Sequence, residues 1–521
     1  TPCGTLFPYT TLFRSGGTDR ISCPYEFTIT LLSSDTEIDP DDVINKAASL
    51  HIHRSGEYYP YSGIVSEFRF IDCSMESATY KLTMVPRVWL LGLNRRTRVF
   101  QKMTVPDIIK QVLSDTNLSD FCEIKINKSY PEHEYLVQYR ESDLNFISRL
   151  MEDHGIWYFF KENPLLPEEL FDTTTAETMV ISDQPSSFGY ISGESSVVYR
   201  SYSGLNERID EEVYESINRV QHDRVMIPKE VFLKNYNYRT PEVDLTGQTS
   251  IKTGNVGTIY DYGGDYKDTN GAQDAAKLTA NRFAMERDIV HGTGNCAGFR
   301  AGARYTLDEH FRSSLNTNYL LTEVEHSGQH TADDRGGRVH TYTNTFRGIE
   351  GSRAENYVPA KNAKTPKVNG VITAHVESNG SDYAALDDRG RYKVRFPFDL
   401  SDTQNYDASK YVRLAQPYSG ANYGIHFPSH EGAEMVLACV DGDPNKPVGI
   451  GTVPNANTTP PVTSSNKTAG IIRTAGGNEL EMEDNDGKQK VTLKSNKVNA
   501  LELNDEDKRI ALQTTDKNAV V

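Results

Sequence analysis

Residues 138–160, QYRESDLNFISRLMEDHGIWYFF, predict a helix followed by a strand, both packed into a core. Ser142 is a favourable N-cap residue, and Asp143 suits the positive end of the helix dipole. Gly155 can end the helix in a left-handed conformation, and Ile156–Phe160 is typical of a buried strand. The residues predicted to form the buried helix face are Leu144, Ile147, Leu150 and Met151. The run offers no nucleophile, metal cluster or phosphate loop, so we interpret it as a packing element.

The same run carries a family resemblance. Its matching positions are Glu141, Asp143, Phe146, Arg149, Leu150, Met151, Glu152, Gly155, Ile156, Tyr158 and Phe160. It resembles the hub domain of VgrG, the valine-glycine-repeat spike of type VI secretion systems, a family related to contractile-phage baseplate hubs and tail spikes. Further segments resemble the family in the same order: 235–241, 298–328, 342–349, 387–399, 411–437 and 441–461.

The resemblance implies a mainly β fold with few helices. We expect a hub-like double barrel over residues 20–365, an oligonucleotide/oligosaccharide-binding (OB) barrel over 366–460, and the start of an intertwined β-helical needle over 461–521. Residues 1–19 match nothing, and the strand with which family members begin is expected to be missing.

Local sequence patterns agree with this expected order of domains. Alternating apolar residues between 25 and 100 predict strands with one wet face. Val105–Leu113 and 271–287 predict helices, and 368–455 has the rhythm of about five barrel strands.

The C-terminal segment is repetitive. Residues 479–484 align with 500–505, 21 residues later, and 491–494 align with 510–513. Each unit is predicted to form two strands of alternating polar and apolar residues, joined by an acidic turn. A single unit of this kind cannot bury its apolar face alone. Ordinary hairpins are the alternative, and the family resemblance favours a needle made of three chains.

The composition of the chain disfavours some classes of partner and structure. The net charge of −17 disfavours nucleic acid as a partner, because phosphates would be repelled. No run of 18 apolar residues predicts a membrane helix. The six scattered cysteines form no CxxC motif, and we expect reduced, mostly buried thiols.

Three histidine pairs could in principle bind metal: His51 with His53, His326 with His330, and His426 with His430. Each lacks a third ligand at a matching spacing, so ordinary structural histidines are the preferred interpretation. Residues 481–487 fail the calcium-loop template, because the glycine falls one place late and no bidentate Glu follows. Asp441 and Asp443 are better explained as a turn.

The GxSxG, HExxH and GxxxxGK[ST] motifs are absent. We therefore predict no catalytic, cofactor-binding or metal-binding residues, no cofactor and no enzymatic activity in the visible chain.

The resemblance implies a structural, homotrimeric spike that punctures target membranes and carries effectors. Its implied partners are a hexameric, Hcp-like tube protein beneath the hub, baseplate proteins, a PAAR-type tip protein, and effectors or their adaptors. Such a spike is assembled in the bacterial cytoplasm and then secreted through the contractile apparatus.

Three alternatives remain open. One is a phage or phage-derived tail hub, and another is a spike with an enzymatic domain beyond Val521. The third is a carbohydrate-binding adhesin, for which Tyr406, Tyr411, Tyr418 and Tyr423 could supply an aromatic platform.

Overall fold

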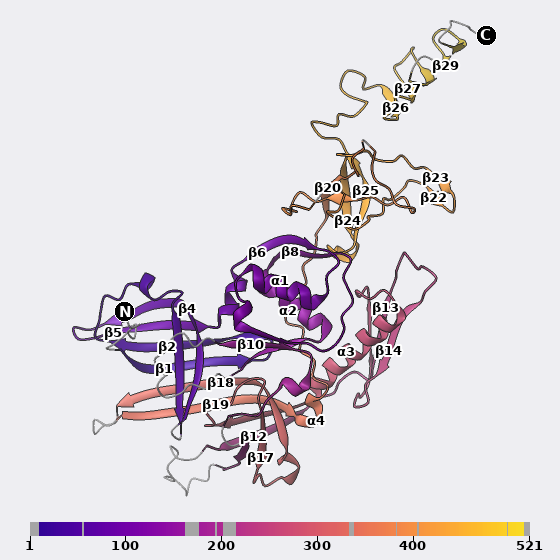
Figure 1. The fold of residues 1–521 in the computed structure, drawn as a ribbon. Coiled ribbons are helices and arrows are strands. Elements are labelled where there is room, and N and C mark those ends of the chain that lie inside the picture. The colour runs from indigo at the N-terminus through magenta and orange to yellow at the C-terminus, as the bar shows by residue number, and fades with distance from the viewer. Residues whose placement is uncertain are drawn as a thin grey trace. The chain divides into compact units, whose positions relative to one another are not determined.

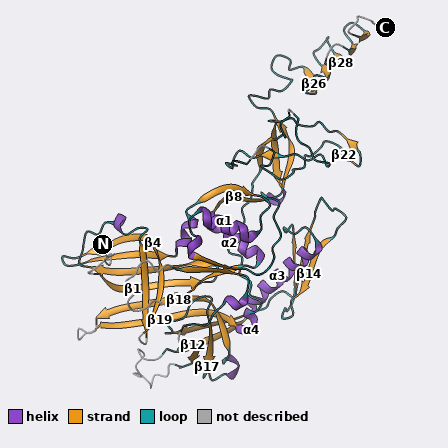
Figure 2. Ribbon diagram, in the orientation of Figure 1, coloured by secondary structure: helices purple, strands orange, loops and turns teal. Residues whose placement is uncertain are grey.

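The computed structural model describes residues 10–54, 57–161, 177–192, 195–201, 215–332, 338–381, 383–403, 406–496 and 499–514. Strands form most of its regular structure (Figures 1 and 2), which confirms the predicted fold class. The chain divides into two compact units. The first comprises residues 1–96, 102–133 and 140–365, and the second comprises 97–101, 134–139 and 366–521.

The helices are α1 (Val105–Asp115), α2 (Asp143–His154), α3 (Thr269–Arg287) and α4 (Gly351–Ala354). The first strands are β1 (Thr10–Arg20), β2 (Cys23–Ser33), β3 (Ala47–Arg54), β4 (Glu57–Cys73), β5 (Ala78–Val85), β6 (Arg95–Phe100), β7 (Cys122–Lys125), β8 (Leu136–Ser142), β9 (Trp157–Lys161), β10 (Thr178–Ser182) and β11 (Ser196–Val198). They are followed by β12 (Ile217–Arg224), β13 (Glu230–Asn235), β14 (Leu245–Ser250), β15 (Thr258–Tyr262), β16 (Asp288–Gly294), β17 (Arg304–Asp308), β18 (Asn318–Ala332) and β19 (Arg338–Glu350). The last strands are β20 (Val371–Val376), β21 (Val394–Arg395), β22 (Ser419–Gly420), β23 (Tyr423–Gly424), β24 (Glu434–Cys439), β25 (Pro447–Val453), β26 (Ala469–Arg473), β27 (Glu479–Glu483), β28 (Lys490–Lys494), β29 (Ala500–Asn504) and β30 (Arg509–Gln513).

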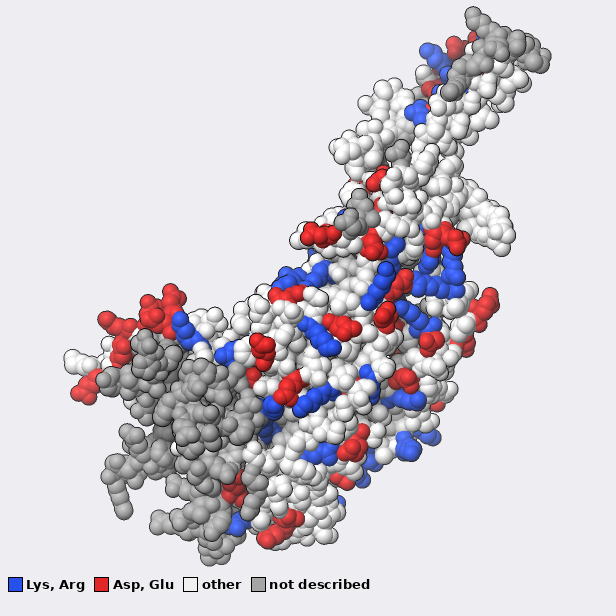
Figure 3. Space-filling model, viewed as in Figure 1, with Lys and Arg blue, Asp and Glu red and all other residues white. Residues whose placement is uncertain are grey.

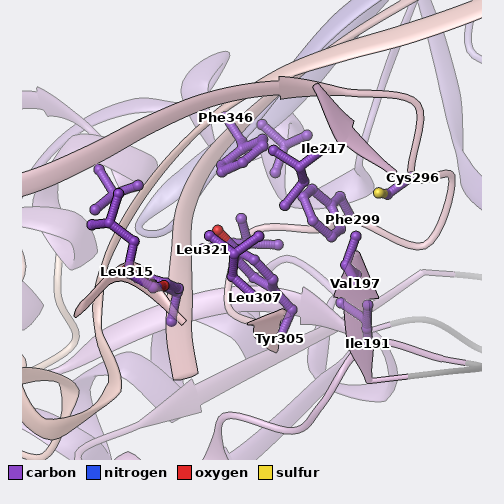
Figure 4. Close-up of a cluster of buried hydrophobic side chains, with 13 residues drawn as sticks. Ile191, Val197, Ile217, Cys296, Phe299, Tyr305, Leu307, Leu315, Leu321 and Phe346 are labelled. Carbon is purple, nitrogen blue, oxygen red and sulfur yellow. Dashed lines mark hydrogen bonds between the residues drawn. The ribbon is translucent and has the colours of Figure 1, made fainter. Parts of the chain in front are cut away.

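A large sheet organises the first unit, with the strand order β12-β16-β19-β18-β1-β2-β5-β4-β3. Strand β17 also pairs with β18, and β11 pairs with β17. A cluster of buried apolar side chains lies against β16, β18 and β19 (Figure 4). In it Phe299 packs edge-on against Phe346, with ring centres 5.0 Å apart. The buried residues that Figure 4 labels are Ile191, Val197, Ile217, Cys296, Phe299, Tyr305, Leu307, Leu315, Leu321 and Phe346.

Strand β1 lies in the middle of this sheet, between β2 and β18, which corrects our expectation that the first strand is missing. Gly17 pairs with Phe27 on β2 and with His326 on β18. A Cβ atom at Gly17 would overlap the ring of Phe27, so this close approach requires glycine. The segment Ser15–Asp19 has no apolar alternation, which is why the sequence pattern did not reveal the strand.

Helix α2 confirms the prediction from the signature run. The hydroxyl of Ser142 accepts a hydrogen bond from the N–H of Asn145 at 3.1 Å, and Gly155 ends the helix with φ = 67°. Leu144 is only half-buried, whereas Phe146, which the predicted face omitted, is fully buried. Strand β9 follows and pairs with β10, which in turn pairs with β7.

The other two predicted helices are also present. In α1 the hydroxyl of Thr104 accepts a hydrogen bond from the N–H of Asp107 at 3.3 Å. Helix α3 packs on the small sheet β14-β13-β15 through its alanine face, made of Ala272, Ala276 and Ala280. Gly247 on β14 allows this contact, because a Cβ there would overlap the carbonyl of Ala272.

The second unit contains a four-stranded sheet, β21-β20-β24-β25, around an apolar core. Residues Tyr135, Val137 and Tyr139, from far earlier in the chain, are part of this core. The N–H of Val137 donates to Oδ1 of Asn445 at 2.7 Å. The sequence analysis did not anticipate this contribution, because nothing local in 134–139 indicates a partner about 300 residues away.

Candidate assembly surface

The tail of the second unit is a five-stranded antiparallel sheet, β26 to β30, in which neighbours in sequence are neighbours in space. Strands β27 and β29 coincide with one aligned repeat segment, and β28 and β30 with the other. Leu493 lies opposite both Leu480 and Leu501, so the repeat also aligns the side chains across strands. The predicted acidic turn at 481–487 joins β27 to β28, with Lys488 N–H bonded to the carbonyl of Asn485 at 2.9 Å.

One face of this sheet is apolar. Its two cross-strand rows are Ile472, Leu480, Leu493, Leu501 and Leu512, and Met482, Val491, Leu503 and Ile510. Because side chains alternate along a strand, both rows project to the same side. All of these except Leu480 are exposed, by 38–68%. Covering them would stabilise the tail by about 1 kcal/mol each, on the scale of roughly 25 cal/mol per Å² of apolar surface.

The opposite face is polar and internally paired. The carboxylate of Glu479 binds Arg473 on one neighbouring strand and Nζ of Lys494, at 2.5 Å, on the other. These hydrogen bonds lower the pKa of Glu479, with Lys494 as the larger cause. Glu502 is held in the same way by Arg509, at 3.0 Å. The tail sheet therefore has one face suited to water and one that needs a cover.

The polar residues of the signature run anchor the segment that ends the first unit. The carboxylate of Glu152 accepts hydrogen bonds from the N–H groups of Asn362 and Ala363, both at 3.0 Å. The side-chain amide of Asn145 exchanges two hydrogen bonds with the backbone of Lys364, at 2.8 and 2.9 Å. Helix α2 therefore fixes the path of the chain at residues 362–364.

A buried ion pair stabilises the same helix. Nη2 of Arg149 lies 2.6 Å from Oε1 of Glu141, and both residues are at most 7% exposed. Asn145 donates to the other Glu141 oxygen at 2.6 Å. On the face that Figure 3 shows, Lys and Arg residues are largely interspersed with Asp and Glu residues.

His326, predicted as one of a possible metal pair, lies instead inside a buried hydrogen-bond network. Its Nε2 is 3.0 Å from the hydroxyl of Tyr61, and its Nδ1 is 2.7 Å from the hydroxyl of Tyr342. Tyr61 also donates to Asp19, at 3.3 Å, and Arg300 lies over the Tyr61 ring. The side chain of His330 is outside the described residues.

Burial changes the proton affinity of both titratable ends of this network. Together with the nearby charge of Arg300, a smaller cause, it lowers the pKa of His326 to about 3. It raises the pKa of Asp19 to about 6, against the opposing effects of Arg300 and the N–H of Ala301. Sequence reasoning missed Asp19 and Arg300 because they are far apart in the sequence, on β1 and on the loop between β16 and β17, and only the fold brings them together.

The remaining histidine candidates have contacts of their own where the structure describes them. His51 is half-buried on β3, which lowers its pKa, and the side chain of His53 is outside the described residues. His426 lies 3.2 Å from the hydroxyl of Tyr392, whereas His430 contacts the ring of Tyr383.

Asp441 and Asp443 lie in the turn between β24 and β25, where Asp443 accepts the N–H of Asn445 at 2.9 Å. Within the described ranges, no group of three or more His, Cys, Asp or Glu residues is arranged to hold a metal ion. Among the helices of the described chain, none is long and apolar enough to cross a membrane.

The four barrel tyrosines form two pairs. Tyr418 and Tyr423 are about 60% exposed on the β22–β23 hairpin, with ring centres 5.3 Å apart. Tyr406 and Tyr411 are half-buried, and their hydroxyls are 2.5 Å apart. An aromatic platform would therefore comprise two tyrosines rather than four.

The cysteines are less buried than expected. Of the described cysteines, Cys296 is buried and Cys73 is exposed. The others, Cys23, Cys122 and Cys439, are half-buried. Burial raises the pKa of Cys122 to about 12, which disfavours a reactive thiolate there.

Two known protein-family models match this chain. Residues 18–332, more than half of the chain, match the model for the phage tail baseplate hub (GPD). The chain belongs to the phage tail baseplate hub family. Beyond this hub region, residues 380–453 match the type VI secretion system/phage-baseplate injector OB domain. The resemblance inferred from the signature run is thereby confirmed.

Curated relatives of this hub protein include VgrG spikes. It is 27% identical over 511 residues to the type VI secretion system spike protein VgrG1b of Pseudomonas aeruginosa, covering 95% of this chain and 66% of the relative. It is also 27% identical over 493 residues to the actin cross-linking toxin VgrG1 of Vibrio cholerae, covering 91% and 43%. The chain therefore spans less than two thirds of the length of these two relatives.

Solved structures share the fold. The E. coli c3393 protein, a type VI secretion component similar to the T4 bacteriophage tail proteins gp27 and gp5, matches with a TM-score of 0.61 and 21% identity, covering 87% of this chain and 99% of that chain. The half-lidded Francisella PdpA–VgrG complex matches with a TM-score of 0.64 and 10% identity, covering 96% and 83%.

Proposed function

We propose that this chain is a structural subunit of a type VI secretion spike, in which three copies wind their tails together. The observation that carries the proposal is the apolar face of β26 to β30, which has no cover within the described residues of one chain. Two further copies would supply that cover and leave the polar, ion-paired face in water. Eight exposed apolar side chains at about 1 kcal/mol each give on the order of 8 kcal/mol per chain.

The mechanical role follows from the same arrangement. Three tails that share one dry interior have no single unit that can unfold alone, so the assembled needle resists bending and local unfolding. The work of puncturing a membrane comes from the contractile apparatus, and the spike transmits it. This role needs no catalytic, metal-binding or cofactor-binding residue, and we propose none for it.

The domain limits and partners are part of the proposal. We assign the hub to residues 20–365, the OB barrel to 366–460 and the needle start to 461–521. A hexameric tube protein beneath the hub, baseplate proteins, a PAAR-type tip protein and effectors complete the assembly. The effector role is supported by the solved PdpA–VgrG complexes of similar fold. Assembly would occur in the bacterial cytoplasm, followed by secretion.

A second candidate is the spike portion of a longer, enzyme-bearing protein. The match to the actin cross-linking toxin favours it, because the region shared with this chain is only 43% of that relative. Sequencing the gene beyond the codon for Val521 tests this candidate directly. A stop codon there would exclude it, and a further domain would support it.

The native mass of the chain tests the trimer. We expect native mass spectrometry to give three copies, and the double variant Leu493→Asp, Leu501→Asp to give one, since it places charges on the apolar face. Thr492→Lys is the control, because it adds a charge on the polar face of the same strand, opposite Glu481 and Glu502, and should leave the trimer intact. A monomeric parent chain, or a double variant that remains trimeric, would contradict the proposal.

A further inference from the structure

Two strands of the chain, β6 and β8, belong to both compact units. Strand β6 begins in the first unit, with residues 95–96, and continues in the second. Strand β8 begins in the second unit, with residues 136–139, and ends in the first, with residues 140–142. The two strands pair with each other (Figure 1). The chain therefore passes between the units within regular structure, and not only at residues 365–366.

Residues 134–139 pack inside the core of the barrel. Tyr135, Val137 and Tyr139 are at most 9% exposed, and they share one apolar cluster with side chains of the barrel strands β20, β21 and β24. The ring of Tyr139 lies 6.2 Å from the ring of Phe398. Nζ of Lys410 lies 5.6 Å from the centre of the Tyr135 ring. The barrel core is therefore completed by residues that precede the barrel by more than 200 positions.

Strand β6 holds β8 in this position. Val99 packs against the same apolar cluster. The side-chain amide of Gln101, just after β6, donates a hydrogen bond to the carbonyl of Asp407 at 2.7 Å. Between the two strands, Nε of Arg98 donates to Oε1 of Gln138 at 2.8 Å. Both strands of the pair therefore contribute contacts to the second unit.

The other ends of the same two strands are fixed in the first unit. The N–H of Asp143, the first residue of α2, donates to the carbonyl of Asn94 at 2.9 Å, and the Asp143 carboxylate lies 3.2 Å from Nε of Arg96. Strand β8 bends at Arg140, which has φ = 49°. Nε of Arg95 donates to the carbonyl of Arg140 at 2.8 Å, so contact between the strands continues through the bend.

Domains of one chain generally fold and unfold as separate units, because each has a hydrophobic core of its own. The second unit does not meet this condition. Its core includes three side chains from residues 134–139, and the strand that carries them runs directly into α2. Unfolding of the first unit would release these residues and open the barrel core. Unfolding of the second unit would leave the same apolar side chains in water.

We propose that β6 and β8 couple the two units of one chain, so that both units unfold together in a single step. This coupling acts within one chain and does not depend on the trimer proposed above. In a spike, it would transmit a load from the barrel to α2 through a pair of strands rather than through residues 365–366 alone.

Pulsed thiol labelling of the full chain in urea, followed by mass spectrometry, tests the coupling. Cys439 is the one cysteine in the sequence of the second unit, and it packs against the barrel core. Cys296 is buried in the first unit. We expect both thiols to lose protection at the same urea concentration. Loss of protection at two different concentrations would overturn the proposal. This measurement needs no variant, so it stands even if a variant fails to fold.

Two variants of the barrel core identify the cause of the coupling. Val394→Ala leaves a cavity at a fully buried residue of β21, and it should lower the urea midpoint of Cys296 as much as that of Cys439. The double variant Val137→Ala, Tyr139→Ala removes the contacts of β8 instead, so Cys439 should lose protection at a lower urea concentration than Cys296. Midpoints that still coincide in the double variant would overturn the proposal, because β8 would then not be the coupling element.

The tail variant Leu493→Asp, Leu501→Asp separates this coupling from assembly. The two thiols should still lose protection together in that chain, because β6 and β8 act within one copy. Midpoints that separate only in the tail variant would show that assembly of the tails couples the units, and would overturn the proposal. A parent chain that is monomeric would refute the trimer and leave the expected coincidence unchanged, so the two proposals fail separately.

Discussion

Replacing His326 by glutamine should change how the stability of the hub depends on pH. The pKa of His326 is about 3 in the folded hub, against the ordinary histidine value of 6.5 in the unfolded chain. Below pH 6.5 the unfolded chain binds a proton that the folded hub cannot bind, so stability is lost as the pH falls from about 6.5 toward 3. Between pH 7 and pH 5 this loss amounts to about 2 kcal/mol.

Asp19 acts in the opposite direction. Its pKa rises from 3.8 to about 6 on folding, so the folded hub binds this proton more readily than the unfolded chain. The resulting stabilisation appears as the pH falls through about 6 and is complete below 3.8. Between pH 7 and pH 5 it adds about 1.3 kcal/mol, so the two groups nearly cancel in the parent protein.

The variants separate the two effects. His326→Gln can keep hydrogen bonds to Tyr61 and Tyr342 but cannot titrate, so its stability change from pH 7 to pH 5 should exceed that of the parent by about 2 kcal/mol in the stabilising direction. Asp19→Asn should shift the same difference by about 1.3 kcal/mol in the destabilising direction. All other titrating groups contribute equally and drop out of the comparison.

Tryptophan fluorescence provides the assay. Both tryptophans of the chain, Trp89 and Trp157, lie in the first unit, so urea unfolding followed by their emission reports on the hub alone. The measurements are made at one protein concentration at both pH values. If His326→Gln kept the pH dependence of the parent to within 0.5 kcal/mol, on the order of experimental error, the buried neutral imidazole could not be the cause.

Two further predictions use the same assay. Gly17→Ala should destabilise the hub by about 1–3 kcal/mol, because its Cβ would overlap the Phe27 ring. Gly16→Ala should be tolerated, because a Cβ there meets only the carbonyl of His326, at 3.6 Å. If the two substitutions destabilised the hub equally, β1 would not be held as described. Arg149→Met should cost about 3–5 kcal/mol, because it removes the cation that balances the buried carboxylate of Glu141. Adding Glu141→Gln should restore part of this loss. If the effects of the two substitutions on the free energy of unfolding were purely additive, the pairing would be refuted.

The sequence predicted the elements whose signals are local. Helix α2 was recognisable because its cap, apolar face and terminal glycine lie within 14 residues. The tail strands were recognisable because the two-residue alternation repeats, and the same alternation predicted that the apolar face of each unit would need cover.

What the sequence did not predict depends on distant pairing. Strand β1 carries glycines where other strands carry apolar residues, so only its neighbours β2 and β18 define it. The partners of His326 come from strands more than 250 residues apart in the chain. Tyr135 enters the barrel core in the same non-local way.

The 21-residue repeat of the tail also limits how its length can change. Because successive strands run antiparallel, removing or adding one strand would reverse the direction of everything that follows. Removing or adding a pair of strands preserves both the direction of the chain and the apolar face of the sheet. It changes the length of the tail by about 10 Å, twice the spacing of neighbouring strands. Tails built on this pattern should therefore differ in length by whole two-strand steps, so that reach is set in discrete increments.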